Sequence, residues 1–329
     1  MSHDLRPLVD WVAEDFEPSV RVGPAPGSYA AVSGGPPSLY GSTDMLCVRS
    51  TLGAPQLTDA EASAWAAVIN DHQDPDTGYF LEAGPASHVE LHVTAYCVAA
   101  LALLDECPRW PLAFAEPWVT PEGITGFLAS LDWKDWVYLE SHRGAGLGSL
   151  AFNVPDLVTT GWWPAYFGGL ERHLDPANGM FGDGKPPGGD LDQIGGTFHY
   201  AFAYESAGRP LPHAAQRVEA VLGLQRDDGL WDPANPFWLT LDAVYLLSRA
   251  MDHEGVDDGR CAAAIRAALD GLAPALTPSG RTAAFGQGLG THSLVAVLST
   301  FAEAQKRLGS DEIVTAIPLE IVLDRRPFI

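Results

Sequence analysis

The chain has 329 residues, of which 47% are hydrophobic, so a packed globular interior is available and wholesale disorder is excluded. It carries 19 basic and 42 acidic residues, which gives a formal net charge of −23. Because nothing basic clusters to offset this charge, nucleic acid and anionic membranes are disfavoured as partners. The acidic residues are expected to form solvated faces.

Residues 1–6 lack the charged-then-apolar pattern of a secretion signal, and no later run is apolar enough to span a membrane. The cysteines, Cys47, Cys97, Cys107 and Cys261, show no CxxC spacing. Because three of them lie in apolar helical patterns, we expect buried thiols in a cytoplasmic protein.

Six amphipathic stripes recur along the chain. In each, apolar or helix-compatible residues stand at i, i+3, i+4 and i+7, and the stripes begin at Leu5, Trp65, Ile124, Trp163, Val218 and Ile265. This pattern is typical of a helix that buries one face and exposes the other. Thr58 with Glu61 forms a capping box, and Pro121 suits the first position of a helix.

Each stripe except the first is followed by a turn rich in Asp, Gly and aromatic residues, and then by a second apolar segment. These second segments are 89–104, 144–154, 197–205, 239–247 and 291–302, of which 144–154 is short and rich in glycine. Helices without a polar face are buried by other helices. The sequence therefore predicts an all-α (α/α)6 toroid of about six helical hairpins, with an inner ring of helices inside an outer ring, and a single domain over 1–329.

One turn carries a recognisable pattern. Gln225, Gly229 and Trp231 have the spacing Q-x-x-x-G-x-W and resemble the QW repeat of terpenoid cyclases and protein prenyltransferase β subunits; 73–80 is a looser copy. The segments 93–96 and 241–245 resemble the inner-helix starts of the same repeats. Since those families fold as α/α toroids, the resemblance implies this architecture along most of the chain.

The catalytic motifs of these families are not matched. The resemblance implies a DxDD motif for a class II cyclase, but the nearest string, Asp190-Leu-Asp192-Gln193, is one acid short. The Asp-x-Cys pair and later His that hold zinc in protein prenyltransferases have no counterpart. Neither the thioester motif of complement-type toroids nor the Cys…Cys-His zinc set of lanthionine cyclases is present, so no activity carries over residue by residue.

Aligning the inner helices reveals a column of polar residues near their expected starts. Five of the six units place Asp or His there, and the third unit has Gly146: the column reads Asp44, His92, Gly146, His199, Asp242 and His292. In a ring these side chains would gather at one end of a central cavity. Three imidazoles and two carboxylates have the composition of a general acid–base site or of a metal site.

Further residues lie beside this column and are expected to bind substrate: His88, Glu90, Arg143, Tyr200, Trp238 and Asp192. The alternative explanation of Asp44 and Asp242 is helix capping, and a single His such as His292 could be a core residue. His142, His173 and His213 fall outside the column and are expected to be surface or packing residues.

We therefore expect an enzyme in which His92, His199 or His292 transfers protons, with Asp44 or Asp242 orienting an imidazole or stabilising a cation. The reaction would be cyclisation or isomerisation of a small, largely uncharged terpenoid-like or polyketide-like molecule. We expect no cofactor; a divalent metal at the same residues is the alternative, although no pair has a dedicated ligand spacing. Two other functions remain open: a carbohydrate-active (α/α)6 epimerase, hydrolase or lyase, and a non-catalytic toroid that binds a ligand or protein.

Overall fold

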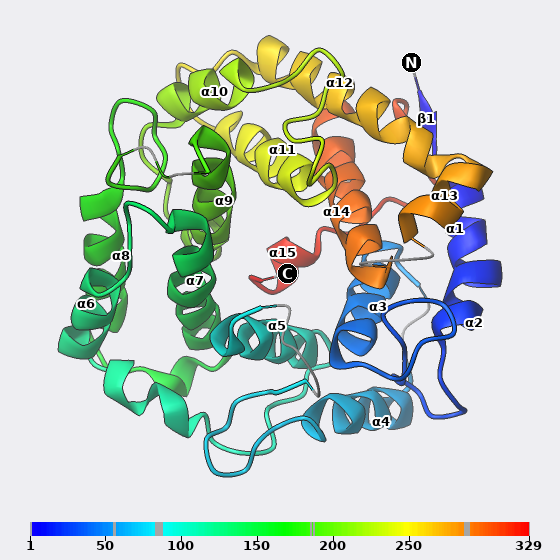
Figure 1. The fold of residues 1–329 in the computed structure, drawn as a ribbon, viewed down its shortest axis with the longest axis horizontal. Helices are drawn as coiled ribbons and strands as arrows, with labels where there is room; N and C mark the ends of the chain where they lie inside the picture. The colour runs from blue at the N-terminus through cyan, green and yellow to red at the C-terminus, as the bar shows by residue number, and fades with distance from the viewer. Residues whose placement is uncertain are drawn as a thin grey trace. The chain divides into compact units, whose positions relative to one another are not determined.

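A computed structural model describes residues 2–54, 57–82, 88–184, 186, 188–285 and 290–328. These residues are mostly helical, and their only sheet is one short pair of parallel strands (Figure 1). The all-α class predicted from the sequence is confirmed. The chain forms two compact units, Met1–Ile69 with Val221–Val322 (unit 1) and Asn70–Ala220 with Leu323–Ile329 (unit 2). Each is described by itself, and the single domain over 1–329 stays a prediction.

Unit 2 consists of two layers of helices (Figure 1). The buried layer contains α5 (Glu90–Leu103), α7 (Val137–Asn153) and α9 (Asp190–Ser206). The outer layer contains α6 (Pro121–Ala129) and α8 (Trp162–Leu170), and α10 (Ala214–Gly223) lies largely in this unit. Short 3-10 turns connect them: Ala113–Trp118, Pro155–Leu157 and Glu171–His173.

Unit 1 places α14 (Gly290–Leu308) between α3 (Leu39–Thr51) and α11 (Trp238–Ala250). The remaining elements are β1 (His3–Asp4), α1 (Arg6–Trp11), a π-helix (Val12–Phe16), α2 (Glu17–Val20), α4 (Asp59–Asn70), α12 (Asp258–Leu276), α13 (Pro278–Phe285) and β2 (Ile313–Val314). α15 (Val322–Arg325) begins at the last residue of unit 1. His3 pairs with Ile313 and Asp4 with Val314.

The pattern of buried and half-exposed helices follows the sequence closely. In α14 every residue from Gly290 to Gln305 is buried, whereas α12 buries one face only. Two helices are longer than expected: α7 begins at Val137 instead of residue 144, and α9 begins at Asp190 instead of residue 197. Both start earlier because segments 137–143 and 190–196, which are of mixed polarity and precede the apolar runs, are helical as well.

Two turns are held by a glutamine side chain. Gln225 Nε2 donates to the Gly229 carbonyl and to the Ala264 carbonyl, both at 2.8 Å, so one amide ties the turn to α12. Gln73 Nε2 does the same with the carbonyls of Gly78 and Trp110. Gly229 has φ +83, and a Cβ there would lie 2.0 Å from the Ala267 oxygen, so this turn requires glycine.

The three glycines of α7 allow the inner helices of unit 2 to approach closely. A Cβ at Gly144 would lie 2.2 Å from Tyr200 Oη of α9, and one at Gly146 would lie 2.7 Å from Leu91 Cδ2 of α5. A Cβ at Gly148 would lie 2.5 Å from Tyr166 Oη of α8. Glycine costs helix stability, so its use here reflects the need for close packing.

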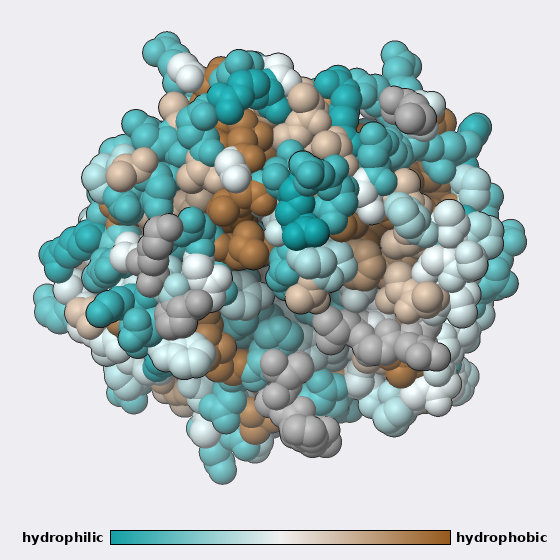
Figure 2. All heavy atoms as spheres, turned by 45° about the horizontal axis from the view of Figure 1, so that its top comes forward, coloured by the Kyte–Doolittle hydropathy of each residue, from teal (hydrophilic) through white to brown (hydrophobic). Residues whose placement is uncertain are grey.

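The surface agrees with the composition. On the face shown in Figure 2, hydrophilic residues predominate and hydrophobic ones are interspersed among them. Cys47, Cys97 and Cys261 are buried thiols, as expected, and Cys107 is exposed. No helix among the residues that the structure describes is long and apolar enough to cross a membrane.

The packing of α7 leads to a stability prediction. Gly144→Ala should destabilise the protein by about 1–3 kcal/mol, because the new methyl group would overpack against the buried Tyr200 ring. The matched control is Gly126→Ala in α6, where an added Cβ meets no atom within 4 Å. That variant should gain about 0.5–1 kcal/mol from the better helix propensity of alanine. Urea unfolding measures both, and equal effects at the two positions would contradict the close-packing explanation.

Candidate functional site

The residues singled out by the sequence fall in both units. Unit 2 contains His92 and His199, together with His88, Glu90, Arg143, Tyr200 and Asp192. Unit 1 contains Asp44, Asp242, His292 and Trp238. The two groups are therefore considered one after the other.

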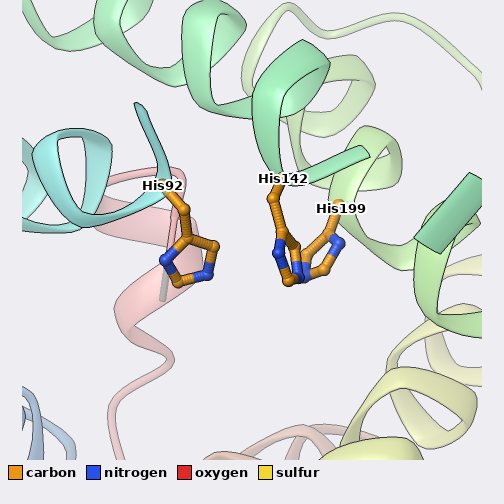
Figure 3. Close-up of side chains that lie close together, drawn as sticks. All are labelled: His92, His142 and His199. Atoms are coloured by element: carbon orange, nitrogen blue, oxygen red, sulfur yellow. The ribbon is translucent and has the colours of Figure 1, made fainter. Parts of the chain in front are cut away.

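In unit 2 three histidines converge from three helices. His92 lies at the start of α5, His142 on α7 and His199 on α9, and one ligand nitrogen from each lies within 4.8 Å of the others. Figure 3 shows the imidazoles pointing toward a common space. All are buried, with 3%, 4% and 5% of His92, His142 and His199 exposed. We call these three residues the histidine cluster.

His142 was expected to be a surface or packing residue, and the structure places it in the core beside His92 and His199. The alignment put Gly146 in the column, but α7 carries its imidazole one helical turn earlier. Since residues four apart lie on the same helix face, a search one turn on either side of the column would have found it. The position of His199 also differs from expectation, because α9 begins at Asp190 and places His199 in its middle.

Hydrogen bonds fix the tautomer of His199. Ser141 Oγ donates to the Tyr138 carbonyl at 2.5 Å, so its lone pair accepts a hydrogen bond from His199 Nδ1–H at 2.8 Å. The proton of a neutral His199 therefore resides on Nδ1, and Nε2 has the lone pair.

Burial keeps two members of the cluster neutral. It lowers the pKa of His142 to about 3, with the nearby His88 as a smaller cause. Burial also holds the pKa of His199 well below its usual value, assisted by His142 and His88. In the described part of the chain, the buried Nδ1 of His142 has no hydrogen-bond partner. An orphaned buried nitrogen is uncommon and costs stability unless a ligand satisfies it.

Aromatic rings surround the cluster. His88 stacks on His92 with a centroid distance of 4.3 Å, Tyr138 stacks on His199 at 5.5 Å, and Phe328 meets His92 edge-on at 4.9 Å. Phe328 belongs to the C-terminal segment, whose Pro327 carbonyl accepts a hydrogen bond from Ser149 Oγ of α7. The sequence analysis did not assign any role to this segment.

The other candidates of unit 2 are engaged elsewhere. Arg143 pairs with Glu140 at 2.9 Å and lies over the Phe127 ring, and Glu90 is exposed at the start of α5. Tyr200 is fully buried against Trp133, and burial raises the pKa of its hydroxyl well above its usual value.

Two more features of unit 2 lie apart from the cluster. Asp192 is half-buried in the first turn of α9, and burial raises the pKa of its carboxyl. A pocket of about 580 Å³ is lined by apolar side chains including Trp163 and Phe167, with Arg209 as its charged residue. No residue predicted from the sequence column lines this pocket.

In unit 1 a buried, hydrogen-bonded Asp–His pair joins α3 to α14. Asp44, which is 0% exposed, accepts hydrogen bonds from Thr291 Oγ1 at 2.7 Å and from His292 Nδ1 at 2.9 Å. The Trp238 ring of α11 lies 4.3 Å from the His292 ring, and Tyr40 meets it edge-on at 5.2 Å. The proton on His292 Nδ1 directs any further proton transfer to Nε2.

Asp242 differs from Asp44 because its carboxyl has no hydrogen-bond partner among the residues that the structure describes. It is 3% exposed and lies one turn after Trp238 on α11. Burial alone raises the pKa of Asp242 well above its usual value. Two other polar atoms near the start of this helix, Trp238 Nε1 and Thr240 Oγ1, are also buried and have no hydrogen-bond partner in the described chain.

Helix capping does not explain either aspartate. Ser38 caps α3 by accepting a hydrogen bond from the Gly41 amide, and Phe237 occupies the N-cap of α11. Asp44 and Asp242 both lie inside their helices.

The neutral state of His142 leads to a pH prediction. Between the ordinary pKa of 6.5 and the folded value of about 3, the unfolded chain binds a proton that the native state does not, so stability falls as the pH falls below 6.5. Each unit of pH costs about 1.4 kcal/mol, or about 2 kcal/mol between pH 6.5 and 5. His142→Gln should lose correspondingly less stability than the wild type.

Urea unfolding at pH 7.5 and 5.0, with a chelator present, measures this difference. The control is His213→Asn, since His213 is exposed and its φ of +61 is tolerated by asparagine. The control should follow the wild type. Parallel losses in wild type and His142→Gln would show that His142 binds a proton equally in both states.

Comparison with known proteins gives a likeness of fold. No protein-family model matches the chain, and no curated protein matches its sequence. Two similar solved structures are variants of the type II terpene cyclase MstE from Scytonema, each in complex with its substrate geranylgeranyl dihydroxybenzoate. They align with TM-scores of 0.50 and 0.47 at 14% and 13% identity, and each alignment covers 80% of this chain and 87% of the other. The alignment with the TM-score of 0.50 supports a terpenoid cyclase-like fold.

Proposed function

We propose that this protein is an enzyme that cyclises or isomerises an apolar, isoprenoid-like small molecule by protonating it from Asp242. The observation that carries the proposal is the buried carboxyl of Asp242, which has no hydrogen-bond partner in the described chain. Burial raises the pKa of this carboxyl well above its usual value, which favours the protonated form that a general acid needs.

Alkenes are weak bases, so the carboxyl must carry its proton when the substrate binds. Water is a stronger base than an alkene and would compete for that proton, so the site must exclude it. The Asp242 proton would be transferred to an alkene carbon, whose π electrons form the new C–H bond and leave a cation on the neighbouring carbon. A second double bond attacks this cation to close a ring. Loss of a proton to a base restores an alkene, so substrate and product are isomers, and reprotonation of Asp242 completes the cycle.

Neighbouring residues fit the later steps. Trp238, one turn before Asp242, provides an aromatic face of the kind that stabilises a cation. His292 contacts Trp238 and has its Nδ1–H held by Asp44, so its Nε2 is suited to accept the final proton. His292 as base and Asp44 as the residue that orients it agree with the roles expected from the sequence column, whereas Asp242 as acid replaces the histidine expected there.

The substrate class follows from charge and from the fold. With a formal charge of −23 and no basic cluster in its sequence, the protein is poorly suited to polyanionic substrates such as diphosphates. The MstE structures contain geranylgeranyl dihydroxybenzoate, a prenylated aromatic compound. An uncharged prenylated compound is accordingly the best candidate.

The alternatives are less well supported. A non-catalytic toroid would use its column residues to bond the backbone, but Asp44 bonds the side chains of Thr291 and His292. A carbohydrate-active enzyme would need a second available carboxylate beside Asp242, and Asp44 is already engaged. Both observations favour a single-acid mechanism.

Asp242→Asn tests the proposal directly. Wild-type protein incubated in D₂O with prenylated alcohols and prenylated dihydroxybenzoates should give a product one deuterium heavier than the substrate's isomer, detected by mass spectrometry. Asp242→Asn should lower the rate by about 10²–10⁴-fold, the usual contribution of a general acid. The control Asp227→Asn changes an exposed carboxyl and should leave the rate unchanged.

The same variant has a stability signature that needs no substrate. Native Asp242 keeps its proton at pH values where the unfolded carboxyl has lost it, so wild-type stability falls as the pH rises above about 4 until the raised pKa of Asp242 is passed. Relative to Asp242→Asn, the wild type should lose about 1.4 kcal/mol per pH unit in this window. A constant difference between the two proteins, or full activity of Asp242→Asn, would refute the role of Asp242.

A further inference from the structure

We propose that the histidine cluster binds a divalent transition metal ion, zinc being the best fit, through His92, His142 and His199. The site lies within unit 2 and does not involve Asp242 or the Asp44–His292 pair. The inference therefore stands apart from the proposed proton transfer.

The three imidazoles lie close enough together to bind one metal ion. Ligand nitrogens of the three side chains lie within 4.8 Å of one another. Three nitrogens bound tetrahedrally at about 2.0–2.1 Å from zinc are about 3.4 Å apart. Small χ rotations of side chains from three helices would close this difference, because each imidazole already points toward the same space (Figure 3).

One nitrogen of His142 is left without a hydrogen bond in the described chain. His142 is 4% exposed, and its Nδ1 is buried with no hydrogen-bond partner in the described chain. Leaving such a group unsatisfied destabilises the folded protein. If His142 served only to pack, a phenylalanine would avoid this cost, so the imidazole at this position requires another explanation. A metal–nitrogen bond provides one.

A hydrogen bond to Ser141 orients the His199 ring for metal binding. Metals bind an imidazole through a nitrogen that carries no proton. His199 donates from Nδ1 to Ser141, which leaves Nε2 for the metal. This is the usual arrangement of a metal-binding histidine, in which the second nitrogen is held by a hydrogen bond that orients the ring.

The ligand set selects the metal. Nitrogen-only ligation suits zinc, copper, nickel or iron, whereas magnesium and calcium prefer oxygen ligands. Three protein ligands leave a fourth tetrahedral position for water or a ligand, as in catalytic zinc sites. Phe328 contacts both His92 and His199, so the C-terminal segment covers the site and limits the access of bulk water.

Metal titration of the full-length protein tests the proposal. After removal of metal with a chelator, Zn²⁺ is added in competition with a chromophoric chelator, and Co²⁺ binding is followed by visible absorption. We expect one metal per chain and the intense d–d bands of four-coordinate cobalt. Thiolate charge-transfer bands should be absent, since the cluster contains no cysteine.

Variants connect binding to the cluster. His142→Ala and His199→Ala should each weaken zinc binding by at least 100-fold and abolish the metal-dependent rise in Tm, whereas the exposed-site control His213→Asn should bind as the wild type does. His142→Gln, with unfolding monitored by circular dichroism, confirms that the loss does not result from misfolding. Asp242→Asn should bind zinc normally even if it is inactive, which separates this proposal from the proposed function.

Three results would overturn the inference. They are zinc binding only at millimolar concentration or with more than one metal per chain, a pale cobalt spectrum of six-coordinate type, and equal affinities of folded His142→Gln and wild type. Any of these would assign the bound metal to exposed groups and leave the cluster as a packing feature.

Discussion

The close contact of α7 with its neighbours is the constraint on which unit 2 depends. Gly144 and Gly146 place the backbone of α7 where a side chain would collide with Tyr200 of α9 and Leu91 of α5. Because the helix axes come so near, side chains on the facing turns meet as well, and His142 reaches His92 and His199 from between them. Glycine lowers the intrinsic stability of α7, and the dense packing of α5, α8 and α9 around it offsets that loss.

Burial acts on both candidate sites in the same way and produces opposite chemistry. Removing a titratable group from water disfavours its charged form, which lowers the pKa of a histidine and raises that of an aspartate. Burial thereby favours the neutral forms of His142 and His199 and the protonated form of Asp242. Asp44 is equally buried but accepts hydrogen bonds from His292 and Thr291. The partners, and not the depth of burial, distinguish a carboxyl that orients an imidazole from one that can donate a proton.

The sequence predicted the helical class well because amphipathic and fully apolar segments alternate strongly, and the helices appear where those patterns lie. It also singled out His92, His199, Asp44, Asp242 and His292, because these residues occupy equivalent positions when the inner helices are aligned at their expected starts. His142 was missed for a physical reason: α7 extends through residues 137–143, where apolar and polar residues are mixed and no continuous apolar run marks a buried helix. The Asp44–His292 pair joins residues from opposite ends of the chain, and no local signal announces a contact of that kind. Phe328 belongs to no repeat, so its contact with the cluster depends entirely on tertiary structure.

The backbone of Phe328 is strained. Its φ is +128, a conformation that a residue with a side chain rarely adopts and that costs about 1–3 kcal/mol. The conformation is held from two sides: the Pro327 carbonyl accepts from Ser149, and the ring packs against His92 and Phe202. Strain of this size is retained where the surrounding contacts over-determine the geometry. The strained backbone brings the Phe328 ring to the cluster, so the strain and the shielding of the three imidazoles go together. Helix α7 contributes to both, because it carries His142 and the Ser149 hydroxyl that holds the C-terminal segment.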